Sequence, residues 1–207
     1  MDSYQIQNEG FKMCYDKISD NKVDFPPTIK SDEFFWGKSN LQEMKDEDAK
    51  RLKWDLRFLD LAKFISKWSR DPSTQTGAVI VDSDNRIVSV GYNGFPKGVD
   101  DSEERYNNRE LKYKIIVHCE RNALLFANRS CKNCTLYTFP FMSCAVCASM
   151  VIQSGIKRCV APANFSFIPK NEPNATEPLK NRWKEEVDLA TQLFKEARVE
   201  LVLIKEK

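Results

Sequence analysis

The sequence contains a single histidine, His118, so any chemistry that needs an imidazole has one candidate. It has no apolar run near the length of about 20 residues that a membrane-spanning helix needs, so we expect no membrane segment. The N-terminus lacks a basic start followed by an apolar stretch, which argues against a secretory signal and predicts a cytoplasmic protein. The formal net charge is only +2, too small to indicate the concentrated basic surface of a nucleic-acid-binding domain.

What the chain does contain is typical of a globular protein with a core. Apolar residues make up 42% of its 207 residues and charged residues 30%. This length suits one domain with an appendage, and we predict an N-terminal extension of unknown role at 1–50 and a domain at 51–207. Seven cysteines, an odd number in a chain expected inside the cell, favour thiols or metal ligands over a disulfide framework.

Strands alternate with helices along the predicted domain. Apolar residues recur every two to four positions over residues 54–69, which predicts an amphipathic helix. A hairpin follows, and then a loop marked by Gly and Pro from Asn93 to about Glu110. This order predicts an α/β domain with parallel crossovers after an opening hairpin. The predicted strands are 77–81, 86–92, 135–138, 158–161 and 200–204, and the later helices are 120–128, 145–154 (C-capped by Gly155) and 182–197, with a Pro-rich loop at 162–178.

Two short segments carry reactive side chains at the starts of predicted helices. His118-Cys119-Glu120 opens one helix, and Cys144-Ala145-Val146-Cys147 opens the next, with 25 residues between His118 and Cys144. One imidazole and two thiolates are three zinc ligands, which leaves the fourth tetrahedral position to water, as in a catalytic site. The positive helix ends favour thiolate over thiol. Glu120 can then act as general acid and base, and H-x-E with C-x-x-C is the signature of zinc deaminases.

From about Trp54 to Ile204 the chain resembles the deoxycytidylate (dCMP) deaminase family of the cytidine deaminase-like fold. Four stretches carry the resemblance in the family's order: DPSTQTGAVIV at 71–81, GYNGFPKG at 91–98, HCERNALLFA at 118–127 and PFMSCAVCASMVIQSGI at 140–156. The resemblance implies a three-layer α/β fold with a central mixed five-stranded sheet flanked by helices. It also implies zinc-dependent hydrolytic deamination of dCMP to dUMP and ammonia, which would supply dUMP for thymidylate synthesis.

The resemblance further implies roles for residues outside the two motifs. Asn93 would bind the sugar hydroxyl, the Ala78 backbone would hold the base edge, and the Tyr137 ring would pack on the base near the metal. Members are commonly homo-oligomers, with a hexamer favoured here and a dimer or tetramer as alternatives. Many members are activated by dCTP, with Mg²⁺ accompanying the nucleotide, and are inhibited by dTTP at a separate site. The residues expected near that site are Tyr92, Asn93, Gly94 and Lys97.

The chain departs from the family at two positions, and neither departure removes a metal ligand. Cys119 stands where a small residue, often alanine, is usual, and Ser143 stands where proline usually precedes the first metal cysteine. A second C-x-x-C, Cys131 to Cys134, could hold half of another zinc site. Because no second histidine exists, we interpret these cysteines as buried thiols.

A substrate with a 5′-phosphate needs cationic or amide donors near the sugar. We favour Arg109 and Lys112 because they are close to His118 in sequence, with Tyr113 beside them. Charged loop residues are also common for solvation alone, so this assignment competes with a purely structural one. The remaining candidates on the same loop are Lys97 and Arg105.

Three hypotheses are open from the sequence. The leading one is a dCMP deaminase. The second keeps the chemistry and changes the substrate to dCTP, a nucleoside or a base in nucleic acid, the last being disfavoured by the low net charge. The third is a zinc-stabilised nucleotide-binding protein without turnover, against which Glu120 speaks because a structural site has no use for that carboxylate.

Overall fold

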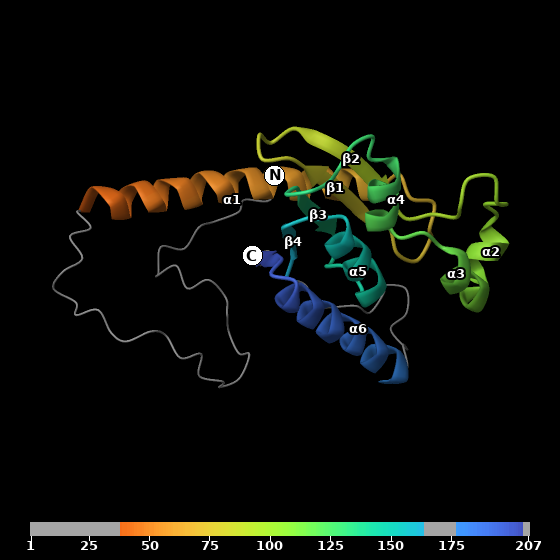
Figure 1. Ribbon diagram of the computed structural model, residues 1–207. Coiled ribbons are helices and arrows are strands. Elements are labelled where there is room, and N and C mark those ends of the chain that lie inside the picture. The colour runs from red at the N-terminus through yellow and green to blue at the C-terminus, as the bar shows by residue number, and fades with distance from the viewer. Residues whose placement is uncertain (1–37, 164–176, 205–207) are drawn as a thin grey trace. The chain divides into compact units, whose positions relative to one another are not determined.

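The computed structural model describes residues 38–163 and 177–204 (Figure 1). The chain divides at Lys53 and Trp54 into two units, and every element after α1 belongs to the unit Trp54–Glu206. None of the described helices is both long and apolar enough to cross a membrane. The helices are α1 Lys38–Ser66, α2 Glu103–Asn107, α3 Arg109–Ile115, α4 Cys119–Phe126, α5 Ala145–Gln153 and α6 Glu177–Glu196. The strands are β1 Gly77–Val81, β2 Ile87–Tyr92, β3 Thr135–Phe139, β4 Arg158–Pro162 and β5 Glu200–Ile204.

The five strands form one mixed sheet in the order β2-β1-β3-β4-β5. β1 pairs antiparallel with β2, Gly77 opposite Tyr92, and antiparallel with β3 on its other side. β3 and β4 are parallel, as are β4 and β5, and α5 and α6 connect these pairs. The predicted mixed sheet, an opening hairpin followed by parallel crossovers, is confirmed.

Helices cover both faces of this sheet, which makes three layers. On one face, Val79 and Val160 pack with Phe58 of α1 in a single apolar cluster. On the other face, Ile80 and Leu136 belong to a cluster that includes buried residues of α4, α5 and α6. Neighbouring residues of β1 therefore face opposite layers, as the two-residue period of a strand requires.

Two glycines allow helices to lie unusually close to the sheet. A Cβ on Gly77 would lie 2.1 Å from the carbonyl oxygen of Ala62 in α1. A Cβ on Gly91 would lie 2.4 Å from the backbone nitrogen of Ala123 in α4. No side chain fits at such distances, so glycine at these positions sets the depth of both helices against β1 and β2.

Three elements differ from their predicted boundaries. α1 begins well before residue 54, and α6 begins at Glu177, before residue 182. The predicted loop that starts at Asn93 contains α2 and the first residues of α3. The side chain of Asn108 caps α3 by accepting from the backbone nitrogen of Leu111 at 3.1 Å. Helices this short show no clear 3.6-residue period, so turn-forming residues dominate their sequence pattern.

The structure tests the predicted end of α5 but not most of the Pro-rich loop or of the N-terminal extension. Gly155 follows α5 with a φ of +83°, which confirms the predicted glycine at the end of that helix. Most of the Pro-rich loop at 162–178 and most of the extension at 1–50 lie outside the described residues.

Candidate metal centre and active site

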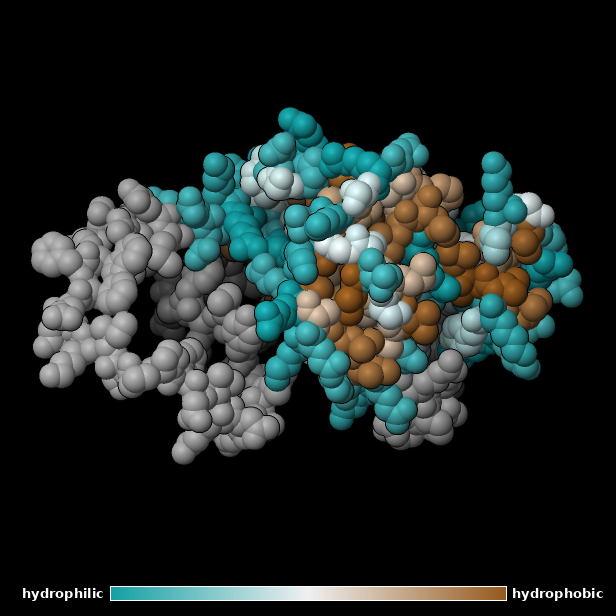
Figure 2. Space-filling view, viewed as in Figure 1, coloured by the Kyte–Doolittle hydropathy of each residue, from teal (hydrophilic) through white to brown (hydrophobic). Residues whose placement is uncertain are grey.

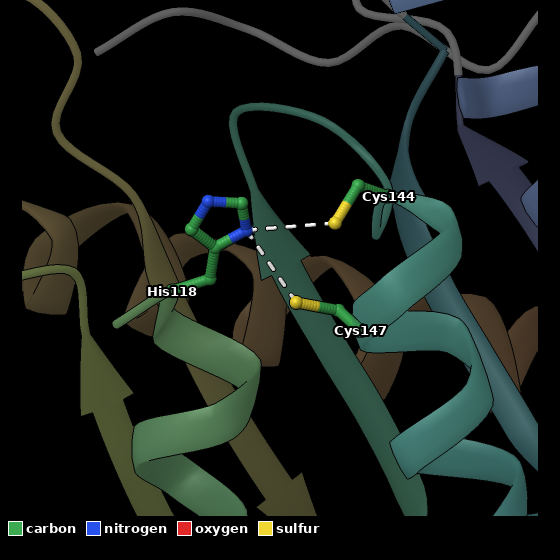
Figure 3. A group of neighbouring side chains, drawn as sticks. All are labelled: His118, Cys144 and Cys147. Atoms are coloured by element: carbon green, nitrogen blue, oxygen red, sulfur yellow. Dashed lines mark hydrogen bonds between the residues drawn. The ribbon is translucent and has the colours of Figure 1, made fainter. Parts of the chain in front are cut away.

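The three predicted metal ligands meet at the N-terminal ends of α4 and α5 (Figure 3). His118 is the N-cap of α4, Cys144 is the N-cap of α5, and Cys147 lies in the first turn of α5. The Nδ1 atom of His118 lies 3.6 Å from Sγ of Cys144 and 3.4 Å from Sγ of Cys147. The donor atoms of all three residues lie within 4.8 Å of one another.

These separations fit a tetrahedral zinc ion. Zn–N bonds of about 2.0–2.1 Å and Zn–S bonds of about 2.3 Å, at tetrahedral angles, place nitrogen and sulfur roughly 3.5 Å apart. The observed 3.4 and 3.6 Å agree with that spacing. Neither His118 nor Cys144 uses its side chain to cap the helix that it precedes, so within the described chain both donors can serve a metal. The residues present therefore fit zinc.

The cluster is electrostatically arranged for a cation. The pKa of Cys144 is lowered to about 4 because the Cys147 thiol donates a hydrogen bond to its sulfur and His118 supplies another. The pKa of Cys147 is raised, because its thiol donates a hydrogen bond to the Cys144 thiolate and because it is buried. Burial alone would lower the pKa of His118, but its hydrogen bond with Cys144 and the charge of Glu120 outweigh burial and raise it. Metal binding to such a group releases its protons and neutralises its charge.

Glu120 lies beside the metal ligands without joining them. It sits in the first turn of α4 and is only 5% exposed. Its Oε2 accepts a hydrogen bond from Sγ of Cys119 at 3.2 Å. Among the described residues, the group of converging ligand atoms comprises the histidine and two cysteines and leaves this carboxylate out. A buried carboxylate that does not ligate the metal is suited to proton transfer.

Asn93 and His118 each adjoin an isolated antiparallel bridge, Asn93 before Gly94 and His118 after Val117. The backbones of Gly94 and Val117 exchange two hydrogen bonds, of 3.1 and 2.9 Å, in an antiparallel bridge. The Asn93 side chain is buried, and its Oδ1 accepts from the backbone nitrogen of Thr76 at 2.7 Å. The structure thus places the backbone of the predicted sugar-binding residue beside the strand-like segment that leads into His118.

Lys112 has an internal partner that its sequence position does not suggest. The Nζ atom lies 2.8 Å from Oδ1 of Asp71, and the two side chains are 6% and 2% exposed. Nζ also contacts the hydroxyl of Ser73. Asp71 already neutralises this ammonium, which argues against the expected contact of Lys112 with the substrate phosphate. Asp71-Pro72-Ser73 has the composition of an Asx turn, a sequence signal that could have indicated a structural role for the Asp71 carboxylate.

The other candidates lie on α3, at the end of β2 and on the loop after it. Arg109 donates from Nε to the hydroxyl of Tyr113 at 3.1 Å, and its guanidinium lies 5.6 Å from the centre of that ring. The pair is one turn apart on α3, and Tyr113 is 40% exposed. Tyr92 is also 40% exposed, and Lys97 is exposed on the loop that follows Gly94.

Tyr137 faces away from the metal ligands, which corrects the expectation that its ring packs on the base. Its hydroxyl donates to Oδ1 of Asp55 in α1 at 2.9 Å, and its ring lies 5.1 Å from that of Phe58. The strand is buried on both faces, so its sequence pattern does not reveal which side chains face which layer. Ala78 does lie on the side of α4, fully buried between β2 and β3.

One supporting contact comes from α6. A carboxylate oxygen of Glu186 accepts from the backbone nitrogen of Ala145 at 3.2 Å, at the first residue of α5. Because Cys144 does not cap α5 with its own side chain, Glu186 supplies an acceptor for that helix end. No local sequence signal marks this contact, since the two residues are 41 positions apart.

The second C-x-x-C belongs to the core. Cys131 and Cys134 are 6% and 3% exposed, and burial raises the pKa of each thiol. Each sulfur contacts a backbone carbonyl at 3.9 Å. The interpretation of these residues as buried thiols is confirmed.

Comparison with known proteins agrees with this geometry. The model of the cytidine and deoxycytidylate deaminase zinc-binding region matches residues 52–163. An uncharacterised deaminase in the luxG 3′ region of Aliivibrio fischeri is 41% identical over 149 residues, 72% of this chain and 92% of that protein. A probable deoxycytidylate deaminase of Caenorhabditis elegans is 43% identical over 158 residues, 64% of this chain and 79% of that protein.

A solved structure shares the fold. The dCMP deaminase of cyanophage S-TIM5, crystallised with dCMP and dUMP, aligns with a TM-score of 0.53 at 21% identity, over 74% of this chain and 97% of that chain. The predicted cytidine deaminase-like fold is therefore confirmed. The matched zinc-binding region and the relatives show that the chain belongs to the cytidine and deoxycytidylate deaminase family, among the deoxycytidylate deaminases.

Proposed function

We propose that this protein is a zinc-dependent enzyme that hydrolyses dCMP to dUMP and ammonia. The observation that supports this best is the convergence of His118, Cys144 and Cys147 next to the buried, non-ligating carboxylate of Glu120. A purely structural zinc site has four protein ligands, whereas three ligands with an adjacent carboxylate are typical of a hydrolytic site. Relatives named deoxycytidylate deaminases support the same substrate.

The proposed reaction needs two things, an activated water and a side chain that carries its protons. A bound zinc ion would supply the Lewis acidity that makes water nucleophilic near neutral pH. Glu120 takes one proton from the attacking water and delivers it to ring N3 as the oxygen adds to C4. It then moves the second proton from that oxygen to the amino group, which leaves as ammonia. The water oxygen remains on C4 as a new carbonyl, so cytosine becomes uracil and Glu120 regains its starting charge.

The substrate contacts that we propose follow from position. Asn93 adjoins the bridge that leads into His118 and would hold the sugar hydroxyl, while the Ala78 backbone would hold the base edge. Arg109 and Tyr113 would contact the 5′-phosphate, because a guanidinium and a hydroxyl that lie one turn apart on α3 and touch each other can donate together to phosphate oxygens.

Replacing the carboxylate of Glu120 tests the proposal directly. Glu120→Gln keeps the shape and removes the proton carrier, so we expect ammonia release from dCMP to fall by about 10²- to 10⁴-fold. Zinc content and circular dichroism should be unchanged. Glu103→Gln, an exposed change in α2, is the matched control and should keep full activity. Wild-type activity in Glu120→Gln would exclude this role and assign the proton transfer to another group.

A rate comparison of dCMP, dCTP, deoxycytidine and single-stranded DNA tests the substrate. We expect dCMP to have the highest kcat/KM. A higher value for another of these would move the assignment to that substrate. Zinc-loaded protein that releases no ammonia from any cytosine nucleotide, with or without dCTP and Mg²⁺, would refute the enzyme altogether.

We also propose that the protein forms a homo-oligomer, with a hexamer favoured. Apolar surface gathers over α4 and α5 in Figure 2, and contiguous exposed apolar surface is typical of contact sites. Light scattering after gel filtration measures the assembly, and a monomer at all concentrations would contradict it. The exposed apolar residues of these helices are Leu125 (69% exposed), Phe126 (65%), Val146 (57%) and Met150 (37%).

Regulation by dCTP and dTTP is a further part of the proposal and rests on the family. The segment of Tyr92, Gly94 and Lys97, from the end of β2 into the loop after it, would lie near the effector nucleotide, with Mg²⁺ on its phosphates. Activation by dCTP with Mg²⁺ and inhibition by dTTP should appear in dCMP saturation curves. If neither nucleotide changes the saturation curve, the proposed regulation is refuted and the catalytic assignment is unaffected.

A further inference from the structure

A buried ion pair connects α3 to the loop before β1. Lys112 and Asp71 are 2.8 Å apart and almost fully excluded from solvent. The same Asp71 oxygen accepts from the backbone nitrogen of Ser73 at 2.9 Å and from that of Thr74 at 3.2 Å. Lys112 thus supplies the counter-charge of a carboxylate that shapes the turn at 71–74.

That turn holds the side chain of Asn93. The Nδ2 of Asn93 donates to the carbonyl of Thr74 at 2.9 Å and approaches Oδ2 of Asp71 at 3.4 Å. Its Oδ1 accepts from the backbone nitrogen of Thr76 at 2.7 Å. The amide is therefore held at both ends by the segment that Asp71 organises, and its orientation is determined by three contacts.

These contacts leave the Asn93 amide one unused hydrogen-bonding position. An amide nitrogen has two protons, and Thr74 and Asp71 take both. An amide oxygen has two lone pairs, and Thr76 takes one. The remaining lone pair of Oδ1 can accept from a hydroxyl, and the backbone of Asn93 adjoins the Gly94–Val117 bridge that leads into the metal ligand His118.

We infer that the Lys112–Asp71 pair is a positioning unit for the substrate sugar, and that it acts by holding the Asn93 amide with its Oδ1 as the acceptor. This inference rests on the proposed function, because it concerns the one sugar hydroxyl of dCMP, at the 3′ position. Lys112 and Asp71 do not themselves touch the substrate. Their effect therefore depends on that hydroxyl and is absent for a substrate that lacks it.

The test compares dCMP with 2′,3′-dideoxycytidine monophosphate, which lacks the 3′-hydroxyl. Wild-type protein should favour dCMP through the hydrogen bond to Asn93. In Lys112→Met the ratio of the two kcat/KM values should fall about tenfold, the scale of one hydrogen bond, mainly through KM for dCMP. Lys114→Met is the matched control on the same helix, since Lys114 is 67% exposed, and it should keep the wild-type ratio.

A purely structural role would give a different pattern. If Lys112→Met slows both substrates equally and leaves the ratio unchanged, the inference is wrong. It is also wrong if the wild-type protein does not prefer dCMP to the dideoxy nucleotide. Should Lys112→Met fail to fold, the double variant Asp71→Asn/Lys112→Met, which leaves no unpaired buried charge, must show the same lowered ratio. Wild-type protein that deaminates neither nucleotide contradicts the proposed function instead.

Discussion

Removing Arg158 should destabilise the protein strongly, because it leaves a buried carboxylate without its counter-ion. Both guanidinium nitrogens, Nη1 and Nη2, lie 2.7 Å from the two oxygens of Asp55 in a bidentate pair. The residues are 8% and 3% exposed, and the pair joins α1 to β4. Breaking such a pair from one side costs about 3–5 kcal/mol.

The structure places the expected loss at the lower end of that range. In Arg158→Met, Asp55 keeps the hydrogen bond from the hydroxyl of Tyr137 at 2.9 Å, so its charge retains one donor. We expect the free energy of unfolding to fall by about 3 kcal/mol. For a domain of this size, that lowers the melting temperature by about 6–12 °C, at about 2–4 °C per kcal/mol.

Denaturant unfolding at constant zinc concentration measures the loss. Arg86→Met is the matched control, because the Arg86 side chain is 76% exposed and lies 3.6 Å from Asp84 at the surface. It should change stability by less than about 1 kcal/mol. The double variant Asp55→Leu/Arg158→Met should recover much of the loss, since no charge remains buried. If Arg158→Met matches Arg86→Met, the reasoning from burial and bidentate geometry is refuted.

Three further changes test the close packing and the metal site. Gly91→Ala should destabilise by about 1–3 kcal/mol or more in thermal unfolding, because its Cβ would lie 2.4 Å from the backbone of α4, and unchanged stability would contradict that approach. Cys147→Ser should abolish zinc retention in metal analysis, whereas Cys131→Ser in the core should retain about one zinc per chain, the content of a single three-ligand site. Glu186→Gln should release zinc to a chelator a few fold faster, since its carboxylate holds the Ala145 amide at the start of α5; equal release rates would rule this out.

Short-range features were largely predictable from sequence. The hairpin of β1 and β2 and the strand β5 follow from apolar runs bounded by turn residues. The ligand set follows from chemistry at fixed spacing, since one histidine and a C-x-x-C leave few other combinations. The helices α2 and α3 were not predictable, because segments of 5 and 7 residues are too short to show a helical period.

Contacts between residues far apart in the sequence could not be predicted from the sequence pattern. Lys112 and Asp71 are 41 positions apart, and a lysine on a loop-like segment ordinarily faces solvent. Tyr137 lies on a strand whose central residues are all buried, so alternation does not tell which of them faces α1. In both cases, the helix or strand that packs against the residue determines which partner its side chain has.

By itself, the sequence determined the chemical groups of this protein: one imidazole, a pair of thiolates and a carboxylate, each at the start of a helix. The tertiary structure decided how these groups are supported, with Asp71 pairing Lys112, Asn93 adjoining the bridge that leads into His118 and Tyr137 turned to the opposite layer. The physical reason is that covalent spacing and periodicity act over a few residues. Burial and charge pairing depend instead on which layers the folded chain brings together.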